Sequence, residues 1–203
     1  MRFRFLSGFC SLLLLTVVTT FVPSAHAAVK PPQTPRKGTA TAVKSPAVPA
    51  GWPKIFSMPR FGVRAAVEAL KFNAVTDVHA PYKWGDVAWY NRGPRPGEAG
   101  RATIFGHLDS TCCPAVFWQL HSLRAGDVVQ VAYKNGPILK FRVMWQGTYL
   151  NARMPLKFMF GRSREHGMTL VTCAGIFHRD GTGYDHKLIV YTRLLLPSGK
   201  LAS

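Results

Sequence analysis

Acidic side chains are scarce in this sequence. Its 203 residues contain 9 Asp and Glu against 26 Lys and Arg, a formal net charge of +17 at pH 7. Such an excess favours anionic partners, among them nucleic acids, lipid headgroups and acidic wall polymers. No run of basic residues alternates with stacking aromatic residues, so nucleic acid is not expected as a partner.

A disulfide framework is also missing. The chain has four cysteines, and Cys10 falls in a predicted export signal, which leaves the adjacent Cys112 and Cys113 and the isolated Cys173. Three cysteines, two of them neighbours, do not form a network of bridges. The adjacent pair could be two small loop residues, an oxidisable partner for Cys173, or zinc ligands together with His107 and Cys173. The spacing matches no standard zinc pattern, and no metal site is predicted.

Only one apolar run is long enough to concern a membrane, and it lies at the amino terminus. Residues 1–28 begin with two arginines, continue with an apolar stretch from Phe5 to Val22, and end with Ala25-His-Ala27, a small-x-small cleavage pattern. The pattern predicts an export signal, and the alternative is an uncleaved membrane anchor. Residues 29–53 are rich in proline and basic residues, which predicts an extended linker.

Residues 54–203 are predicted to form one domain dominated by β-strands. Several short apolar runs are separated by glycine-containing turns, which is typical of an antiparallel barrel or sandwich. Strands are expected at Arg101–His107, Asp127–Tyr133, Ile138–Tyr149, Met168–Cys173 and Lys187–Leu196, and short helices at Gly85–Tyr90 and Pro114–Leu120.

Two strand ends carry side chains suited to nucleophilic catalysis. Cys173 is expected at the last position of its strand, where a rigid element meets a loop and catalytic groups are often found. A buried, unreactive cysteine is the other interpretation. His107 ends the strand predicted at 101–107. An imidazole beside a thiol favours the thiolate and can later protonate a leaving amine.

Several segments, taken in order, resemble the sortase family, and most closely the class E/F sortases of actinobacteria. The matching segments are Asp86–Tyr90 with Pro94–Gly100, Gly106-His-Leu-Asp109, Ala115–Leu120, Leu123–Asp127, and Thr169-Leu-Val-Thr-Cys173, which fits the family's TLxTC signature. The resemblance extends over about residues 55–196. It implies a closed eight-stranded β-barrel with a few short helices.

The resemblance also implies a reaction. A sortase-type cysteine transpeptidase cleaves an LPxTG-like sorting signal near the carboxyl terminus of a surface protein. It holds the acyl group as a thioester on Cys173 and transfers it to an amine of a peptidoglycan precursor or a pilin, with His107 as acid and base. The expected location is outside the cytoplasm, at the cell surface, membrane-anchored or secreted. A sortase-fold module that only binds, and a thiol peptidase that only hydrolyses, are the alternatives.

The family's third catalytic residue is an arginine one strand after the cysteine, and here the sequence departs from the pattern. Lys187 falls in that position, and lysine keeps the charge but loses the planar fork of donors. Arg179, in the following loop, is the second candidate, and a gap would bring His186 there instead. Arg193 lies too far along the strand. Some sortases need calcium, which requires clustered carboxylates. Residues 81–100, which precede the histidine strand, contain only Asp86 and Glu98, so neither calcium nor another cofactor is expected.

Overall fold

The computed structural model describes residues 47–70, 81–134 and 136–202. The predicted export signal (1–28) and most of the predicted linker (29–53) lie outside these residues. The strands are β1 (Pro53–Met58), β2 (Val63–Leu70), β3 (Val87–Tyr90), β4 (Gly100–Gly106), β5 (Val128–Tyr133), β6 (Ile138–Leu150), β7 (His166–His178) and β8 (Gly183–Leu195). The helices are η1 (Pro59–Phe61), η2 (Leu120–Ser122), η3 (Asn151–Arg153) and α1 (Leu156–Phe160). Within the described part of the chain, no helix has the length and apolar character needed to cross a membrane.

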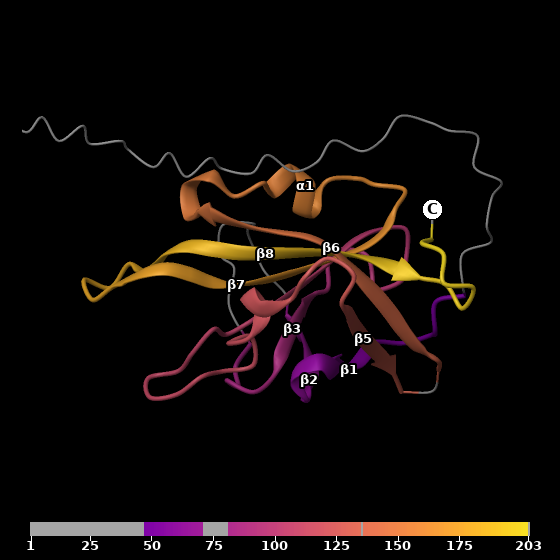
Figure 1. Ribbon diagram of the computed structural model, residues 1–203, viewed down its shortest axis with the longest axis horizontal. Helices are drawn as coiled ribbons and strands as arrows, with labels where there is room; N and C mark the ends of the chain where they lie inside the picture. Colours follow the sequence, from indigo (N-terminus) through magenta and orange to yellow (C-terminus); the bar gives the residue numbers. More distant parts are fainter. Residues whose placement is uncertain (1–46, 71–80, 135, 203) are drawn as a thin grey trace, which may run out of the picture.

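The strands form a closed barrel in the order β1-β2-β3-β4-β7-β8-β6-β5. This confirms the prediction of a closed eight-stranded barrel. The expectation that all neighbours would be antiparallel is wrong, because β2 pairs with β3 and β4 pairs with β7 in parallel. The β7–β8 hairpin extends beyond the other strands, and the segment that carries α1 runs along the outside of the barrel (Figure 1).

The strands predicted at 101–107, 127–133 and 138–149 correspond closely to β4, β5 and β6. The helix expected at Gly85–Tyr90 is wrong, because Val87–Tyr90 forms β3 between β2 and β4. The helix expected at Pro114–Leu120 is also wrong, since Pro114 forms a β-bridge with Asp109, residues 116–119 are turns, and Leu120 begins η2. In both places tertiary pairing outweighs local preference.

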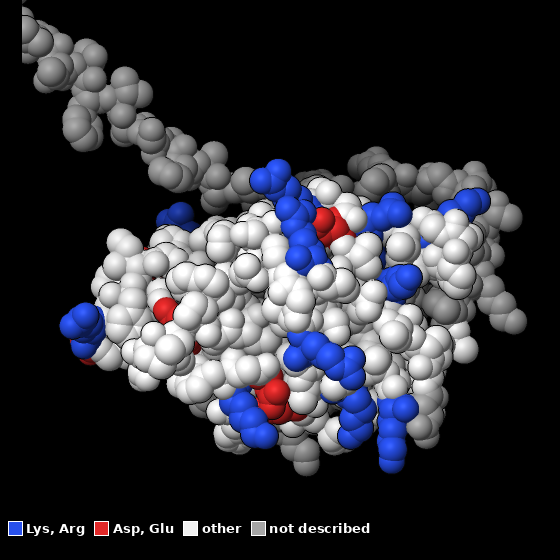
Figure 2. All heavy atoms as spheres, turned by 60° about the horizontal axis from the view of Figure 1, so that its bottom comes forward, with Lys and Arg blue, Asp and Glu red and all other residues white. Residues whose placement is uncertain are grey.

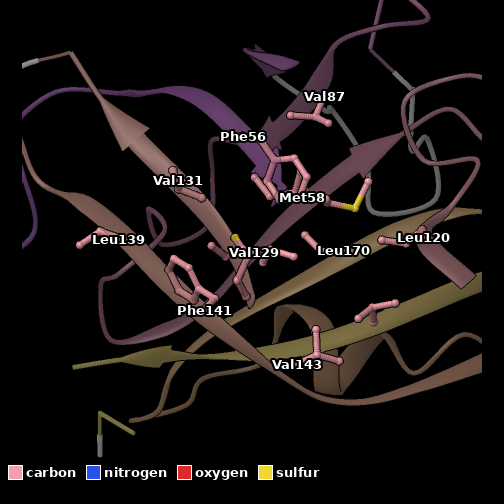
Figure 3. Packing of buried hydrophobic residues seen from close by; sticks show 14 of the residues in the cluster. Phe56, Met58, Val87, Leu120, Val129, Val131, Leu139, Phe141, Val143 and Leu170 are labelled. Carbon is pink, nitrogen blue, oxygen red and sulfur yellow. The ribbon is translucent and has the colours of Figure 1, made fainter. Parts of the chain in front are cut away.

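The barrel interior is filled by large apolar side chains from nearly every strand (Figure 3). Phe56 and Phe117 meet edge to face with ring centroids 5.6 Å apart, a geometry that aromatic pairs prefer. The largest fully buried side chains include Phe56, Met58, Ile104, Phe117, Leu120, Phe141, Met168, Leu170, Ile189 and Leu194.

A second apolar cluster covers the outer face of β4, β7 and β8. It contains Phe105, Val171 and Ile189 from these strands and Met159 from α1. Strands buried on both faces read as continuous apolar runs, and β4 and the first half of β7 are buried at almost every residue. These two strands therefore give a rigid support to the residues at their ends.

Candidate active site

The end of β4 lies beside the middle of β7, where the pairing of the two strands stops. The two strands are parallel and in register, with Phe105 opposite Val171. The Thr172 hydroxyl donates a hydrogen bond of 2.8 Å to the carbonyl oxygen of Gly106. This contact fixes the residue before His107 against the residue before Cys173. The parallel pairing therefore brings the predicted histidine and cysteine to the same end of the barrel.

Cys173 lies within β7 and not at its end, since β7 continues to His178. The expectation of a cysteine at the last strand position is wrong, because the β7–β8 hairpin continues past it. Cys173 is half-buried and faces Lys187 across the strand pair. Lys187 Nζ donates a hydrogen bond of 3.1 Å to Cys173 Sγ. An ammonium group at this distance stabilises negative charge beside it.

Gly175 allows the chain to bend two residues after Cys173. Its φ of +82° belongs to the region that favours glycine, and a Cβ there would collide with Asp185 and the His186 ring. The pairing of β7 with β8 shifts register between Ala174 and Phe177. Asp185 closes this irregular stretch by accepting a 2.8 Å hydrogen bond from the backbone N–H of Ile176. The bulge separates the regular strand below Cys173 from the exposed hairpin turn.

The His107 ring is held by two neighbours in the segment that precedes β3. Nε2 lies 2.8 Å from the carbonyl oxygen of Pro81. A carbonyl can only accept, so Nε2 carries the hydrogen and Nδ1 is the atom free to accept a proton. Trp84 packs on the ring with centroids 4.2 Å apart. Gly106 is required beside the histidine, because a Cβ there would meet the Phe117 ring at 2.5 Å.

A hydrogen bond joins the segment after His107 to the strand that carries Lys187. The Tyr184 hydroxyl donates to Asp109 Oδ2, across 75 residues of sequence. The bond to Asp109 and, to a smaller degree, burial and the charges of Asp109 and Cys173 raise the pKa of Tyr184 to about 12. Tyr184 also contacts Phe177 edge to face, with centroids 5.1 Å apart.

Arg179, His186 and Arg193 occupy other positions on the β7–β8 hairpin. Arg179 is exposed near the hairpin turn, where it helps to line a hollow of about 720 Å³ together with Asp109 and Tyr184. His186 is half-buried, and its Nδ1 lies 2.7 Å from Asp185. Arg193 lies further along β8, opposite Gly167. Among the described residues, Lys187 is the cation that donates a hydrogen bond to Cys173.

The adjacent cysteines lie on an exposed turn beside the site. The thiols of Cys112 and Cys113 are free, as is that of Cys173. Ser110 closes the turn by donating a 3.0 Å hydrogen bond to the carbonyl oxygen of Cys113. Among the described residues no three His, Cys, Asp or Glu side chains gather in a way that could hold a metal ion. An oxidisable pairing with Cys173 stays a hypothesis.

Sequence reasoning missed the residues that hold the histidine and bridge the two strands. Pro81 contacts His107 through its backbone carbonyl, and no sequence pattern predicts such a contact. Trp84 and Tyr184 are distant in sequence from their partners His107 and Asp109. Asp109 stands in the histidine motif, and its position two residues after His107 is the one signal that could have drawn attention to it.

A model of the family described as Sortase domain matches residues 56–195. A search of curated proteins gives no match.

Solved structures with the same fold include sortases of several classes. A sortase D5 transpeptidase of Clostridium perfringens has a TM-score of 0.52 at 18% identity, covering 70% of this chain and 78% of that one. Sortase C-1 of Actinomyces oris has a TM-score of 0.54 at 17% identity, covering 70% and 73%. Sortase A of Corynebacterium diphtheriae has a TM-score of 0.54 at 16% identity, covering 72% and 61%. At these identities the likeness concerns the fold, and assignment to class E/F stays a prediction.

Proposed function

Since the chain belongs to the sortase family of cysteine transpeptidases, we propose that Cys173, His107 and Lys187 are its catalytic residues. The substrate we propose is a surface protein with an LPxTG-like sorting signal near its carboxyl terminus. The acceptor is an amine of a peptidoglycan precursor or of a pilin. The enzyme works at the cell surface, outside the cytoplasm, either anchored in the membrane by its amino-terminal segment or secreted.

The observation that carries this proposal is the 3.1 Å hydrogen bond from Lys187 Nζ to Cys173 Sγ. The two residues are direct neighbours in the β7–β8 ladder. The parallel β4–β7 pairing and the Thr172–Gly106 hydrogen bond support a place for His107 at the same end of the barrel. A thiol, a cation and a histidine gathered at one end suit covalent acyl transfer.

The first half-reaction forms the thioester. The Cys173 thiolate attacks the carbonyl carbon of the scissile peptide bond, and the negative charge moves to the carbonyl oxygen. The Lys187 ammonium, freed from the sulfur as its charge is lost, stabilises that oxyanion. The His107 imidazolium gives its Nδ1 proton to the departing amine, the C–N bond breaks, and the acyl group remains on sulfur.

The second half-reaction restores the thiolate. The acceptor amine attacks the thioester carbon and gives up a proton to neutral His107. The C–S bond then breaks, and the sulfur leaves as a thiolate that pairs again with Lys187. Dividing the transfer into two steps lets one enzyme exchange one amide bond for another. If water replaces the amine, the product is a free acid, which is the outcome of a hydrolytic thiol peptidase.

Lysine in the arginine position is the feature that favours a second candidate function. A sortase-fold module that binds a sorting peptide or an anionic wall polymer without turnover would not need the planar donors of arginine. Incubation of the protein with sorting-signal peptides, followed by intact-mass measurement, distinguishes the two. A thioester on Cys173 supports the transpeptidase. Peptide binding without an adduct in the wild type, together with an adduct in Lys187→Arg, supports the binding module.

A further inference from the structure

A hollow lined by arginines lies at the end of β4 and β7 opposite to the cysteine and histidine. It has a volume of about 910 Å³, within the range of small-molecule sites. Its lining includes Arg101 of β4, Arg92 of the β3–β4 connection, and Arg162 and Arg164 of the segment between α1 and β7.

This hollow is separate from the proposed catalytic residues. Gly100, at the start of β4, lines the hollow, whereas His107 follows the last residue of the same strand. Seven steps along a strand correspond to roughly 23 Å. A group bound in the hollow therefore does not reach Cys173, and the residues of the hollow have no part in the acyl transfer described above.

Arg101 forms the fixed part of the lining. Its guanidinium pairs with Glu165 at 2.9 Å and donates a 3.2 Å hydrogen bond to the carbonyl oxygen of Phe158. It also lies 4.3 Å from the centroid of the Phe158 ring, a favourable cation–π distance. Glu165 balances the charge of Arg101, and the salt bridge and ring contact hold its side chain in place.

The other three arginines are exposed and carry unbalanced charge. Within the described residues, no carboxylate forms a salt bridge with Arg92, Arg162 or Arg164, and none lines the hollow. Figure 2 shows the same imbalance more widely, since basic side chains outnumber acidic ones on the face in view. Like charges that share a hollow repel one another, and a bound anion removes this repulsion.

The arginine side chains indicate which class of anion the hollow would bind. The charged side chains of the lining are all arginines, and the planar guanidinium fork matches phosphate and carboxylate oxygens better than an ammonium does. The exposed arginines come from two segments and surround one hollow. This arrangement suits an anion such as phosphate, which carries several acceptor oxygens on one atom. The carboxylates of an acidic peptide are spread along the chain at about 3.3 Å per residue.

The hollow also offers an apolar wall. Tyr90 and Phe160 both line it, and their rings meet edge to face with centroids 5.1 Å apart. Aromatic surface of this kind accommodates the carbon part of a phosphate ester. We propose that the hollow is a binding site for phosphate esters, such as a phosphodiester polymer or a phospholipid headgroup, and that it holds the protein on an anionic surface while the catalytic end remains free.

The test compares charge loss inside the hollow with equal charge loss beside it. Binding of a soluble glycerol phosphate oligomer to the full chain is measured by isothermal titration calorimetry at low salt. The double variant Arg162→Ala/Arg164→Ala should weaken binding by tenfold or more. The control Arg153→Ala/Lys157→Ala removes two exposed cations from the same β6–β7 connection, outside the hollow, and should weaken binding less than threefold.

Two further probes identify the source and the class of the anion. Vesicles of phosphatidylglycerol and phosphatidylcholine that bind with the same dependence on Arg162 and Arg164 assign a lipid headgroup. Failure of the vesicles while the oligomer binds assigns a free phosphate ester. Polyglutamate of equal charge that binds as tightly as the oligomer, with the same mutational loss, overturns the proposal in favour of an acidic peptide. Equal loss in both double variants, or no binding of the oligomer by the wild type, also overturns it.

Discussion

Replacement of Lys187 by methionine tests the role of the cation beside the thiol. Methionine has a similar length and no charge, so Lys187→Met removes the hydrogen bond to Cys173 Sγ with little change in volume. Lys187→Arg is the matched control, because it retains a positive charge and adds the planar donors that the family normally has here.

The expected size of the effect follows from the 3.1 Å separation. Coulomb attraction between an ammonium and a thiolate at this distance is about 1 kcal/mol in bulk water and about 5 kcal/mol at an effective dielectric constant of about 20. Both residues are half-buried, which places the contribution between these limits. A loss of roughly 3 kcal/mol corresponds to a rate about 100-fold lower. This agrees with the loss of roughly 100- to 1000-fold seen when a precise oxyanion donor is removed.

The measurement has two parts. The rate at which iodoacetamide alkylates Cys173 at pH 7 reports the thiolate alone, and the rate of thioester formation with a sorting-signal peptide reports the thiolate and the oxyanion together. Cys112→Ser/Cys113→Ser is the background for all variants, since both of these thiols are exposed and would also react. Lys187→Met should lower both rates, whereas Lys187→Arg should keep each within about tenfold of the wild type or exceed it.

An unchanged alkylation rate together with an unchanged thioester rate in Lys187→Met would refute the reasoning. A lower thioester rate with unchanged alkylation would restrict the role of Lys187 to the oxyanion. If Arg179→Ala instead produced the loss predicted for Lys187→Met, the cation would have been assigned to the wrong residue.

Three other predictions follow from the geometry of the described residues. Tyr184→Phe should remove from the alkaline absorbance titration a tyrosine with a midpoint near pH 12. Because its folded pKa lies above the ordinary value of about 10, the stabilisation that Tyr184 gives is complete below about pH 10 and is lost as the pH rises towards 12. If the titration curves of the wild type and of Tyr184→Phe have the same midpoints, the prediction is wrong. Gly175→Ala should lower the free energy of unfolding by at least about 1–2 kcal/mol, since the positive φ and the collision with Asp185 both oppose a side chain. Equal stability of the wild type and the variant in urea unfolding would argue against the bend at Gly175. Phe141→Ala leaves a cavity at a fully buried position and should lower the free energy of unfolding by about 3–5 kcal/mol. The melting temperature should fall by roughly 6–20 °C. A loss of less than about 1 kcal/mol would contradict the packing shown in Figure 3.

The strands with a clear apolar pattern could be predicted from the sequence. Ile138–Leu150 alternates between buried and exposed residues in its first half, and the sequence shows the corresponding alternation of apolar residues. Val87–Tyr90 was mistaken for a helix because four residues are too few to show a period, and because its partners come from β2 and β4. The parallel pairing of β4 with β7 could not be predicted from local sequence, because about sixty residues of other structure separate the two strands.

The candidate site was predictable where it depends on motifs and not where it depends on contacts. Cys173 and His107 stand in recognisable motifs at strand ends or near them. Lys187 could be placed by matching its strand to the one that carries the arginine in the family, and the structure puts it opposite Cys173. The Tyr184–Asp109 hydrogen bond and the Pro81 carbonyl bring together residues that are 75 and 26 positions from their partners, and no local pattern encodes such pairs.

The most direct test of the account is the intact mass of the full chain after incubation with sorting-signal peptides, with and without an amine acceptor. The account predicts an adduct with the mass of the acylated enzyme that is absent from Cys173→Ala and disappears when the amine is added, while an amide product accumulates. No adduct with any peptide, in either the wild type or Lys187→Arg, would contradict the assignment of Cys173, His107 and Lys187 as a transpeptidase site.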